Sequence, residues 1–313
     1  MINKKIRPLK ISTDLKQIAS LLEVCFSDSM DEDGKRYIAY LREFSQTILF
    51  TKIAEKNPEM YSLPAEGFVY EEKEKLVGNI TLSPMKYGDE IVYLISNVGV
   101  LPEYREKGIA KLLTKTALEY IMCQGVRQTW LQVKQENHAA IELYRQFQFQ
   151  SFMTRTTWIG KRENLFLKKF DEYSLRKRKK EEWKTQKKLL ERVYPGELTA
   201  TYGFEIASMQ PKIKNFVKNF LRGRITNHWA AEVNRQVGFV SYDLFPDQNY
   251  VNLWLGVPQP LEAQFIHILI PAVQARICNE IRVNYPEKEC SDCFLAVGMQ
   301  ELNTLIWKRR YLS

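Results

Sequence analysis

The sequence predicts an α/β (α+β) protein with two related domains, each built from a mixed central sheet flanked by helices. Three observations lead to this prediction. The chain has 313 residues, which is about twice the usual length of one domain. Apolar patterns with the periods of strands and helices alternate along it. Short stretches also recur in the second half, such as V-G-N-I at 77–80 and V-G-F-V at 237–240.

The elements of the first half follow in a regular order. We expect a first strand at 5–11, helices at 14–26 and 34–44, and a hairpin formed by strands 67–71 and 76–82. The next elements are a central strand at 91–100, a helix at 108–123 ended by Gly125, a strand at 129–133, a helix at 139–147 and a closing strand at 152–159.

The second half repeats this order more loosely. L-G-V at 255–257 resembles V-G-V at 98–100, and a helical stretch at 261–278 and a strand at 281–283 follow it. We therefore expect a first domain at 1–160, a basic, helical linker at 161–199 and a second domain at 200–313.

The formal net charge is +9, and the excess is concentrated at 161–192, which includes R-K-R-K-K at 176–180. Such a run raises nucleic-acid binding as a hypothesis. We favour a solvated linker helix, because Glu181, Glu182 and Glu191 are mixed into the run and aromatic residues are not interleaved through it.

Other features of the composition bound the class of protein. The apolar runs are too short for a transmembrane helix, and the N-terminus lacks the pattern of a secretion signal, so we expect no membrane contact and a cytoplasmic location. Five cysteines favour reduced thiols over a disulfide framework. Cys290 and Cys293 form a lone C-x-x-C pair without partners, so no metal is expected. The sequence leaves the oligomeric state open.

The most informative segment runs from 97 to 113, N-V-G-V-L-P-E-Y-R-E-K-G-I-A-K-L-L, and reads as a strand, a loop and a helix start. The amide groups at a helix N-terminus form an anion site that fits a pyrophosphate. Gly108 allows a positive φ and close approach of a phosphate, while the small Ala110 limits crowding behind it. Lys107 and Lys111 add positive charge.

The same segment resembles the GNAT superfamily of N-acetyltransferases, whose cofactor loop is written Q/R-x-x-G-x-G/A. R-E-K-G-I-A at 105–110 matches every fixed position. W-L-Q-V-K-Q-E-N-H-A-A-I-E-L-Y at 130–144 resembles the second cofactor element of the family. The resemblance covers approximately residues 4–160.

The resemblance implies acetyl-CoA as cosubstrate and a small-molecule or peptide amine as acceptor. Two neighbouring strands would splay apart, and the pantetheine arm would lie between them, where a backbone N–H meets the acetyl carbonyl. Tyr144 would be the general acid, although a half-buried aromatic with no chemical role is the alternative. The implied cofactor contacts are Val98, Gly99, Val100, Arg105, Glu106, Lys107, Gly108, Ile109, Ala110, Lys111 and Asn137.

Three departures from the family pattern matter. Gln132 stands where some relatives carry a catalytic Glu that acts as the general base, so no general base is assigned. Glu90, Glu103 and Glu136 are candidates that would act through a water, but each is more typical of an exposed surface carboxylate. Gln148 replaces the glycine that usually ends the last helix. In the second half, V-P-Q-P-L-E-A at 257–263 cannot form the amide cradle, and Phe294 stands in the place of Tyr144, so this domain is expected to be non-catalytic.

The leading hypothesis is acetyl transfer to a primary amine by direct attack in a ternary complex. The alternative is a non-catalytic sensor of coenzyme A or acyl-CoA, since the missing base is compatible with binding alone. A nucleic-acid adaptor using the basic run is the third interpretation. Neither the identity of the amine nor the role of the second domain can be read from the sequence.

Overall fold

The computed structural model describes residues 5–56, 63–64, 66–161, 175–202, 204–213, 215, 224–244 and 249–312. The chain divides into two compact units. Unit 1 comprises Met1–Val133, Asn137–Ser151 and Lys308–Ser313, and unit 2 comprises Lys134–Glu136 and Phe152–Trp307. Helices and strands intermingle in both, which confirms the expected α/β (α+β) class.

The sheet of unit 1 begins with five strands that lie side by side in sequence order. They are β1 (Ile6–Pro8), β2 (Glu66–Glu72), β3 (Lys75–Tyr87), β4 (Glu90–Val100) and β5 (Gln128–Lys134). Neighbours are antiparallel from β1 to β4, whereas β4 and β5 are parallel. The expected hairpin and the central position of β4 are therefore confirmed.

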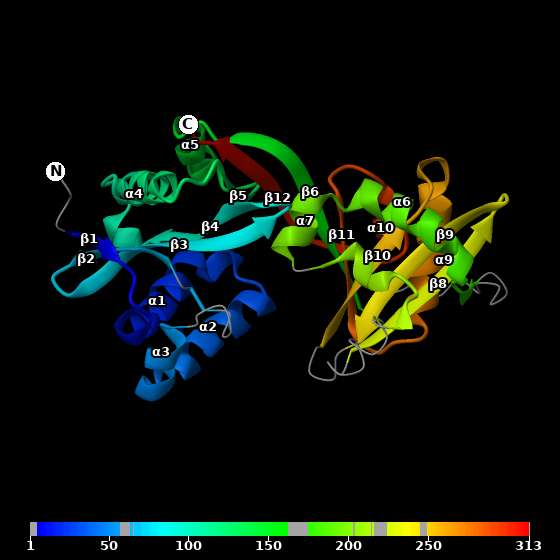
Figure 1. The fold of residues 1–313 in the computed structure, drawn as a ribbon, viewed down its shortest axis with the longest axis horizontal. Helices are drawn as coiled ribbons and strands as arrows, with labels where there is room; N and C mark the ends of the chain where they lie inside the picture. The colour runs from blue at the N-terminus through cyan, green and yellow to red at the C-terminus, as the bar shows by residue number, and fades with distance from the viewer. Residues whose placement is uncertain are drawn as a thin grey trace. The chain divides into compact units, whose positions relative to one another are not determined.

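The helices of unit 1 cover both faces of this sheet. In Figure 1, one group of helices lies on one side of the sheet and a second group on the other. The first group consists of α1 (Ile11–Phe26), α2 (Glu32–Ser45) and α3 (Ile48–Ala54), and the second of α4 (Ile109–Cys123) and α5 (His138–Gln146). The apolar stripe expected on the first helix is buried: Leu15, Ile18 and Leu22 are each at most 2% exposed.

Unit 2 repeats the strand order of unit 1. Its strands are β7 (Leu175–Lys177), β8 (Ile225–Val233), β9 (Gln236–Leu244), β10 (Tyr250–Gly256) and β11 (Glu280–Pro286). Neighbours are again antiparallel until the last pair, β10 and β11, which is parallel. Its helices include α6 (Trp183–Val193), α7 (Gly196–Thr201), α9 (Glu262–Gln274) and α10 (Ser291–Ala296). This shared order supports two GNAT-like halves.

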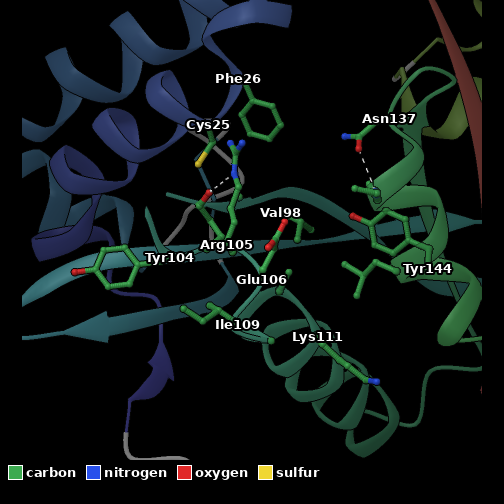
Figure 2. A pocket seen from close by; sticks show the side chains of 17 residues that line it. Cys25, Phe26, Val98, Tyr104, Arg105, Glu106, Ile109, Lys111, Asn137 and Tyr144 are labelled. Carbon is green, nitrogen blue, oxygen red and sulfur yellow. Dashed lines mark hydrogen bonds between the residues drawn. The ribbon is translucent and has the colours of Figure 1, made fainter. Parts of the chain in front are cut away.

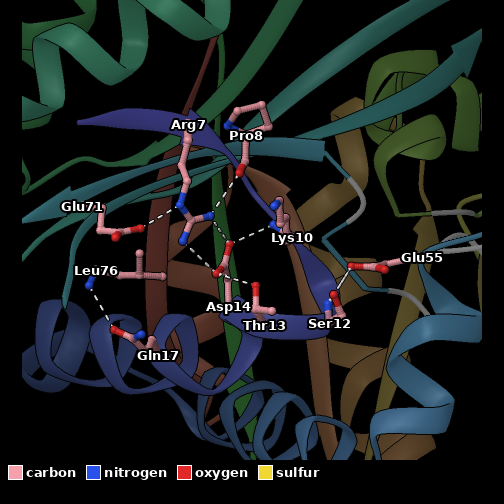
Figure 3. A network of polar contacts seen from close by, with 10 residues as sticks. All are labelled: Arg7, Pro8, Lys10, Ser12, Thr13, Asp14, Gln17, Glu55, Glu71 and Leu76. Atoms are coloured by element: carbon pink, nitrogen blue, oxygen red, sulfur yellow. Dashed lines mark hydrogen bonds and ion pairs between the residues drawn. The ribbon is translucent and has the colours of Figure 1, made fainter. Parts of the chain in front are cut away.

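A buried ion pair fixes the start of the first helix in unit 1 (Figure 3). Arg7 on β1 contacts the Asp14 carboxylate twice, at 2.7 and 3.0 Å, and Glu71 at 2.7 Å. Asp14 also accepts the backbone N–H of Lys10 at 2.8 Å. Burial raises the pKa of Asp14, but the hydrogen bonds from Arg7, the Lys10 N–H and Thr13 together outweigh it and hold that pKa below its usual value.

The same arrangement occurs at the start of unit 2. Arg176 on β7 contacts the Glu182 carboxylate through both terminal nitrogens, and Glu182 accepts the backbone N–H of Lys179 at 2.7 Å. The basic run therefore forms the first strand and the helix start of unit 2, where β7 and α6 take the places that β1 and α1 have in unit 1.

The expected division at 1–160, 161–199 and 200–313 stays a prediction about domains, and the compact units have different bounds. Residues 175–199 lie inside unit 2, with Trp183 and Leu190 in its core. Residues 162–174 are outside the described part of the chain. Most of β6 (Gln150–Gly160), expected as the closing strand of the first domain, pairs antiparallel with β11 in unit 2.

Unit 1 is completed instead by the end of β12 (Gln300–Tyr311). From Lys308 onward this segment belongs to unit 1, where the Leu312 N–H donates to the Arg127 carbonyl at 2.8 Å and Lys308 Nζ donates to Ser151 Oγ at 2.9 Å. Among the described residues, each helix is too short or too polar to cross a bilayer.

Candidate functional site

A β-bulge interrupts β4 next to the predicted cofactor loop. Gly99 faces Asn79 and Ser96 faces Thr81, so β4 carries one residue more than β3 between these two pairs. Asn97, inside the bulge, has a positive φ of 51°. Bulges bend a strand and change the direction of its backbone groups.

Strands β4 and β5 pair only before the bulge and separate after it. Their paired residues are Tyr93 with Thr129, Leu94 with Trp130 and Ile95 with Leu131. Both strands continue, β4 to Val100 and β5 to Lys134. Their ends therefore form an opening in the sheet, which agrees with the splayed strands that the family resemblance implies.

The loop after β4 leads into α4 through a left-handed residue. Gly108 is the N-cap, with φ 76°, and no side chain caps the helix. A Cβ built on Gly108 would meet no atom within 4 Å, so the space in front of the helix is open. Arg105 holds the loop to the strand, because its Nε donates to the Val100 carbonyl at 3.2 Å. Uncapped amides at a helix start are suited to hold an anion.

Two predicted residues belong to α5. Asn137 is its N-cap, and its Oδ1 accepts the Ala140 N–H at 3.1 Å. Tyr144 is buried, 6% exposed, and packs edge-on against Phe149 with ring centroids 5.8 Å apart. Burial raises the pKa of Tyr144 well above its usual value, so the hydroxyl stays protonated.

These elements surround one pocket of unit 1, with a volume of about 510 Å³. Figure 2 shows the Tyr144 hydroxyl directed into it. All the predicted site residues except Lys107 line it, namely Val98, Gly99, Val100, Arg105, Glu106, Gly108, Ile109, Ala110, Lys111, Asn137 and Tyr144. The Lys107 side chain turns to Glu103, whose carbonyl accepts its Nζ at 2.8 Å, and it lies over the Tyr104 ring.

Sequence reasoning missed several lining residues. Cys25 and Phe26, at the end of α1, contribute to the wall, as do Tyr104, Ala139, Ala140 and Leu143. Helical spacing from Asn137 and Tyr144 could have indicated Ala140, and the same spacing from Ala140 leads to Leu143. Cys25 left no comparable signal, because it reaches the pocket through the packing of α1 on β4: a Cβ on Gly99 would lie 3.2 Å from Cys25 Sγ.

The three carboxylates considered as bases lie outside the pocket lining. Glu90 is 3.6 Å from Arg127, and Glu103 is 3.3 Å from Lys75. Glu136 is exposed, and Gln132 is half-buried on β5. None of them is placed to take a proton in the pocket, so the general base stays unassigned.

The corresponding part of unit 2 is occupied by its own side chains. Leu255 and Val257 stand where unit 1 has Val98 and Val100. The Leu255 N–H donates to the Tyr194 hydroxyl at 3.0 Å, and Arg192 donates to the Val257 carbonyl at 3.1 Å. The carboxylate of Glu262, in the first turn of α9, is buried and ion-paired with Arg192.

The end of the last helix also corresponds in the two units. The Phe149 N–H donates to the Tyr144 carbonyl at 3.0 Å, and the Met299 N–H donates to the Phe294 carbonyl at 3.0 Å. Phe294 therefore takes the place of Tyr144, stacked on Trp158 with no proton to donate. The expected non-glycine helix end is confirmed, since Gln148 has a φ of 59°.

The Acetyltransferase (GNAT) family model matches residues 19–149. No curated protein matches the chain significantly. A GCN5-related N-acetyltransferase from Sphaerobacter thermophilus is 10% identical with a TM-score of 0.59, and the match covers 99% of this chain and 97% of that one. A tandem GNAT protein from the clavulanic acid biosynthesis pathway is 14% identical with a TM-score of 0.51, over 98% of each chain. Residues 19–149 therefore match the acetyltransferase (GNAT) family, and the chain shares the fold of a tandem GNAT protein.

Proposed function

We propose that the protein is an acetyl-CoA-dependent N-acetyltransferase that acetylates a primary amine by direct attack in a ternary complex. One observation carries the proposal: the uncapped start of α4, the end of β4 that no longer pairs with β5, and the Tyr144 hydroxyl meet in a single pocket. When bound, acetyl-CoA supplies an acetyl group activated as a thioester.

The pocket residues suit that cosubstrate. The amides at the start of α4 suit a pyrophosphate, because the helix dipole favours an anion there and Gly108 leaves the approach open. Lys111 adds a positive charge at the pocket edge. The backbone of Val98 to Val100 would pair with the pantetheine amides. Asn137 would contribute its Nδ2, because its Oδ1 is engaged with Ala140.

In the transfer, the amine nitrogen forms a bond to the acetyl carbon and the carbon–sulfur bond breaks. A backbone N–H of Val98 to Val100 would stabilise the negative charge that develops on the carbonyl oxygen. Tyr144 would donate its proton to the departing sulfur, and burial keeps that proton in place at neutral pH. The amine would enter neutral and lose a proton to solvent, since Glu90, Glu103 and Glu136 lie outside the pocket lining and the carboxylate that lines it, Glu106, is assigned to the cofactor side. Unit 2 would take no part in the chemistry.

The test is a screen that follows thiol release from acetyl-CoA with small amines, polyamines, aminoglycosides and peptide N-termini. We expect at least one class to accelerate release in proportion to enzyme concentration. The missing base favours a second candidate, a sensor of coenzyme A or acyl-CoA. Tight binding of coenzyme A without accelerated release by any amine would support the sensor.

A further inference from the structure

A fully buried amide lies behind the bulge of β4. Asn79 on β3 is 0% exposed. Its Nδ2 donates to the backbone carbonyl of Asn97 at 2.9 Å and to Thr81 Oγ1 at 3.3 Å. Asn97 Nδ2 also reaches Thr81 Oγ1, at 3.5 Å. Asn79 therefore donates a hydrogen bond to the Asn97 carbonyl, which lies at the bulge and outside the regular hydrogen-bond ladder of the sheet.

The bulge needs such support. Asn97 has a positive φ of 51°, a conformation that costs energy for any residue with a side chain and persists only where its surroundings hold it. The Asn97 carbonyl is in a half-buried residue, and leaving it without a partner would add a further cost. In the bulged register the Asn79 amide donates to this carbonyl and so removes the cost of leaving it unpaired. In a regular strand the carbonyl would pair with the neighbouring strand, and the amide would give no such stabilisation.

Unit 2 provides an internal comparison. At the same register Gly256 faces Phe239, Leu255 faces Val240 and Trp254 faces Ser241, with no shift between the pairs. Phe239 thus stands where unit 1 has Asn79, and β10 has no bulge there. The half of the chain with the amide has the bulge, and the half with the aromatic ring does not.

We propose that Asn79 is a positioning residue for the cofactor groove. It holds the bulge at Asn97, and the bulge turns the backbone of Val98 to Val100 toward the pocket that these residues line. This inference rests on the proposed function. It assigns to a residue outside the pocket lining the role of keeping the groove open.

The cost of Asn79 to the fold supports this role. Its Oδ1 is buried and has no hydrogen-bond partner among the residues that the structure describes. A polar atom left in this state lowers stability, so an apolar residue of similar size would suit the core of a regular sheet better. Residues that lower stability are typical of functional positions.

The experiment is the change Asn79→Val, followed by calorimetric titration with coenzyme A and by urea unfolding. Valine favours a regular strand. We expect the dissociation constant to rise at least tenfold, while the unfolding midpoint stays equal or increases. The KM for acetyl-CoA should rise in parallel, with the KM for the amine nearly unchanged. A purely structural role for Asn79 would give the opposite result: a lower midpoint and unchanged affinity.

Thr129→Val is the matched control. Thr129 is also 0% exposed, and its Oγ1 donates to the Tyr93 carbonyl at 2.8 Å, in the paired part of β4 before the bulge. We expect its affinity for coenzyme A to stay within twofold of wild type. An equal loss in both variants would overturn the inference, since it would reflect general damage to the sheet.

The outcomes separate this inference from the proposed function. A wild-type protein that does not bind coenzyme A contradicts the proposed function. Normal binding by wild type, with Asn79→Val within threefold of it, overturns the role of Asn79 alone. If Asn79→Val does not fold, Thr81→Val removes the hydroxyl that both amides contact and should weaken coenzyme A binding. Unchanged affinity in that folded variant would likewise overturn the inference.

Discussion

Gly108 combines a left-handed backbone with open space at the start of α4. Gly108→Val should abolish coenzyme A binding, because a β-branched residue is disfavoured at positive φ and would occupy the approach to the amides. Calorimetric titration measures the loss. Gly125→Val is a close control: Gly125 follows the other end of α4, has a φ of 71° and also has open space at its Cβ position. The control should be destabilised similarly but bind normally, and normal binding by Gly108→Val would place the phosphates elsewhere.

Tyr144 is the residue on which the proposed chemistry depends most. Tyr144→Phe keeps the ring and removes the proton, so kcat should fall by about 10²- to 10⁴-fold while the KM for acetyl-CoA changes little. Burial raises the pKa of Tyr144, so its ionisation should produce no decline in rate between pH 7 and about 10. Steady-state kinetics would check both points, with Tyr120→Phe as a control tyrosine outside the pocket lining. A change in kcat below about threefold, with chemistry rate-limiting, would rule out the general-acid role.

His228 should make stability depend on pH. Burial, reinforced by the charges of Arg178, Lys177 and Arg224, lowers its pKa from 6.5 to about 3. Below pH 6.5 His228 is protonated in the unfolded chain but stays neutral in the folded protein. The free energy of unfolding therefore falls as the pH is lowered from 6.5 towards 3. The slope from this residue approaches about 1.4 kcal/mol per pH unit well below pH 6.5. In urea unfolding, the difference in stability between wild type and His228→Gln should change by about 0.7 kcal/mol from pH 7 to 6 and by about 1.2 kcal/mol from pH 6 to 5; a difference that does not change with pH would contradict this prediction.

For single residues, the sequence predicted the site correctly where the residues lie close together along the chain. The loop at 105–110 and the spacing from Asn137 to Tyr144 lie within continuous segments, so their residues reach one pocket as expected. The side chain of Lys107 does not, because the Glu103 carbonyl and the Tyr104 ring draw it aside. The contact between Asn79 and Asn97 depends on strand register, which no local pattern fixes.

Each unit begins with a strand followed by a helix, β1 with α1 in unit 1 and β7 with α6 in unit 2. Equivalent ion pairs hold these two segments, and the pairs differ in burial. The Asp14 side chain is 2% exposed and that of Glu182 is 16% exposed. Arg7→Gln should cost about 3 kcal/mol, because it leaves a buried charge without its partner. Arg176→Gln should cost less, about 1 to 2 kcal/mol, because solvent screens Glu182 in part.

Urea unfolding of both variants measures this difference, and a larger loss from Arg176→Gln would contradict it. Turnover per folded molecule should stay within about twofold of wild type in Arg176→Gln, since the exposed part of this charge is screened within about 10 Å. A loss of turnover at unchanged stability would instead implicate the basic run in capture of the substrate.

The basic run shows why this element was harder to predict than the cofactor loop. Its charge favoured a solvated linker, yet several of its cations are engaged within unit 2. Lys177 lies 3.9 Å from the centre of the Trp229 ring, and Arg178 donates to Gln186 and to the Met209 carbonyl. Charge in a sequence does not reveal its partners when some of them, such as Met209 and Trp229, come from segments more than thirty residues away.

For the whole molecule we expect one coenzyme A per chain. Unit 1 offers uncapped amides and an open groove, whereas in unit 2 Tyr194 and Arg192 already hold the matching backbone groups and Glu262 places a negative charge at the helix start. Calorimetric titration should give a stoichiometry near one. Two sites of comparable affinity would show that the groove of unit 2 can open.

The succession of elements along each unit followed from the sequence more closely than the bounds of the units did. Alternating patterns and the repeated V-G motif predicted two halves with a similar succession of strands and helices, as observed. The exchange of closing strands, β6 in unit 2 and the end of β12 in unit 1, left no trace in periodicity. A strand has the same apolar pattern whichever sheet it joins.

The exchange of closing strands affects how the protein can fold while it is synthesised on the ribosome. Domains generally fold in turn as they emerge, at about 5 to 20 residues per second. Unit 1 draws its last residues from Lys308–Ser313, which are synthesised after all of Phe152–Trp307. Its sheet must therefore wait, on the order of ten seconds, with an unfinished edge beside β5. The half that carries the proposed chemistry begins first and is completed last.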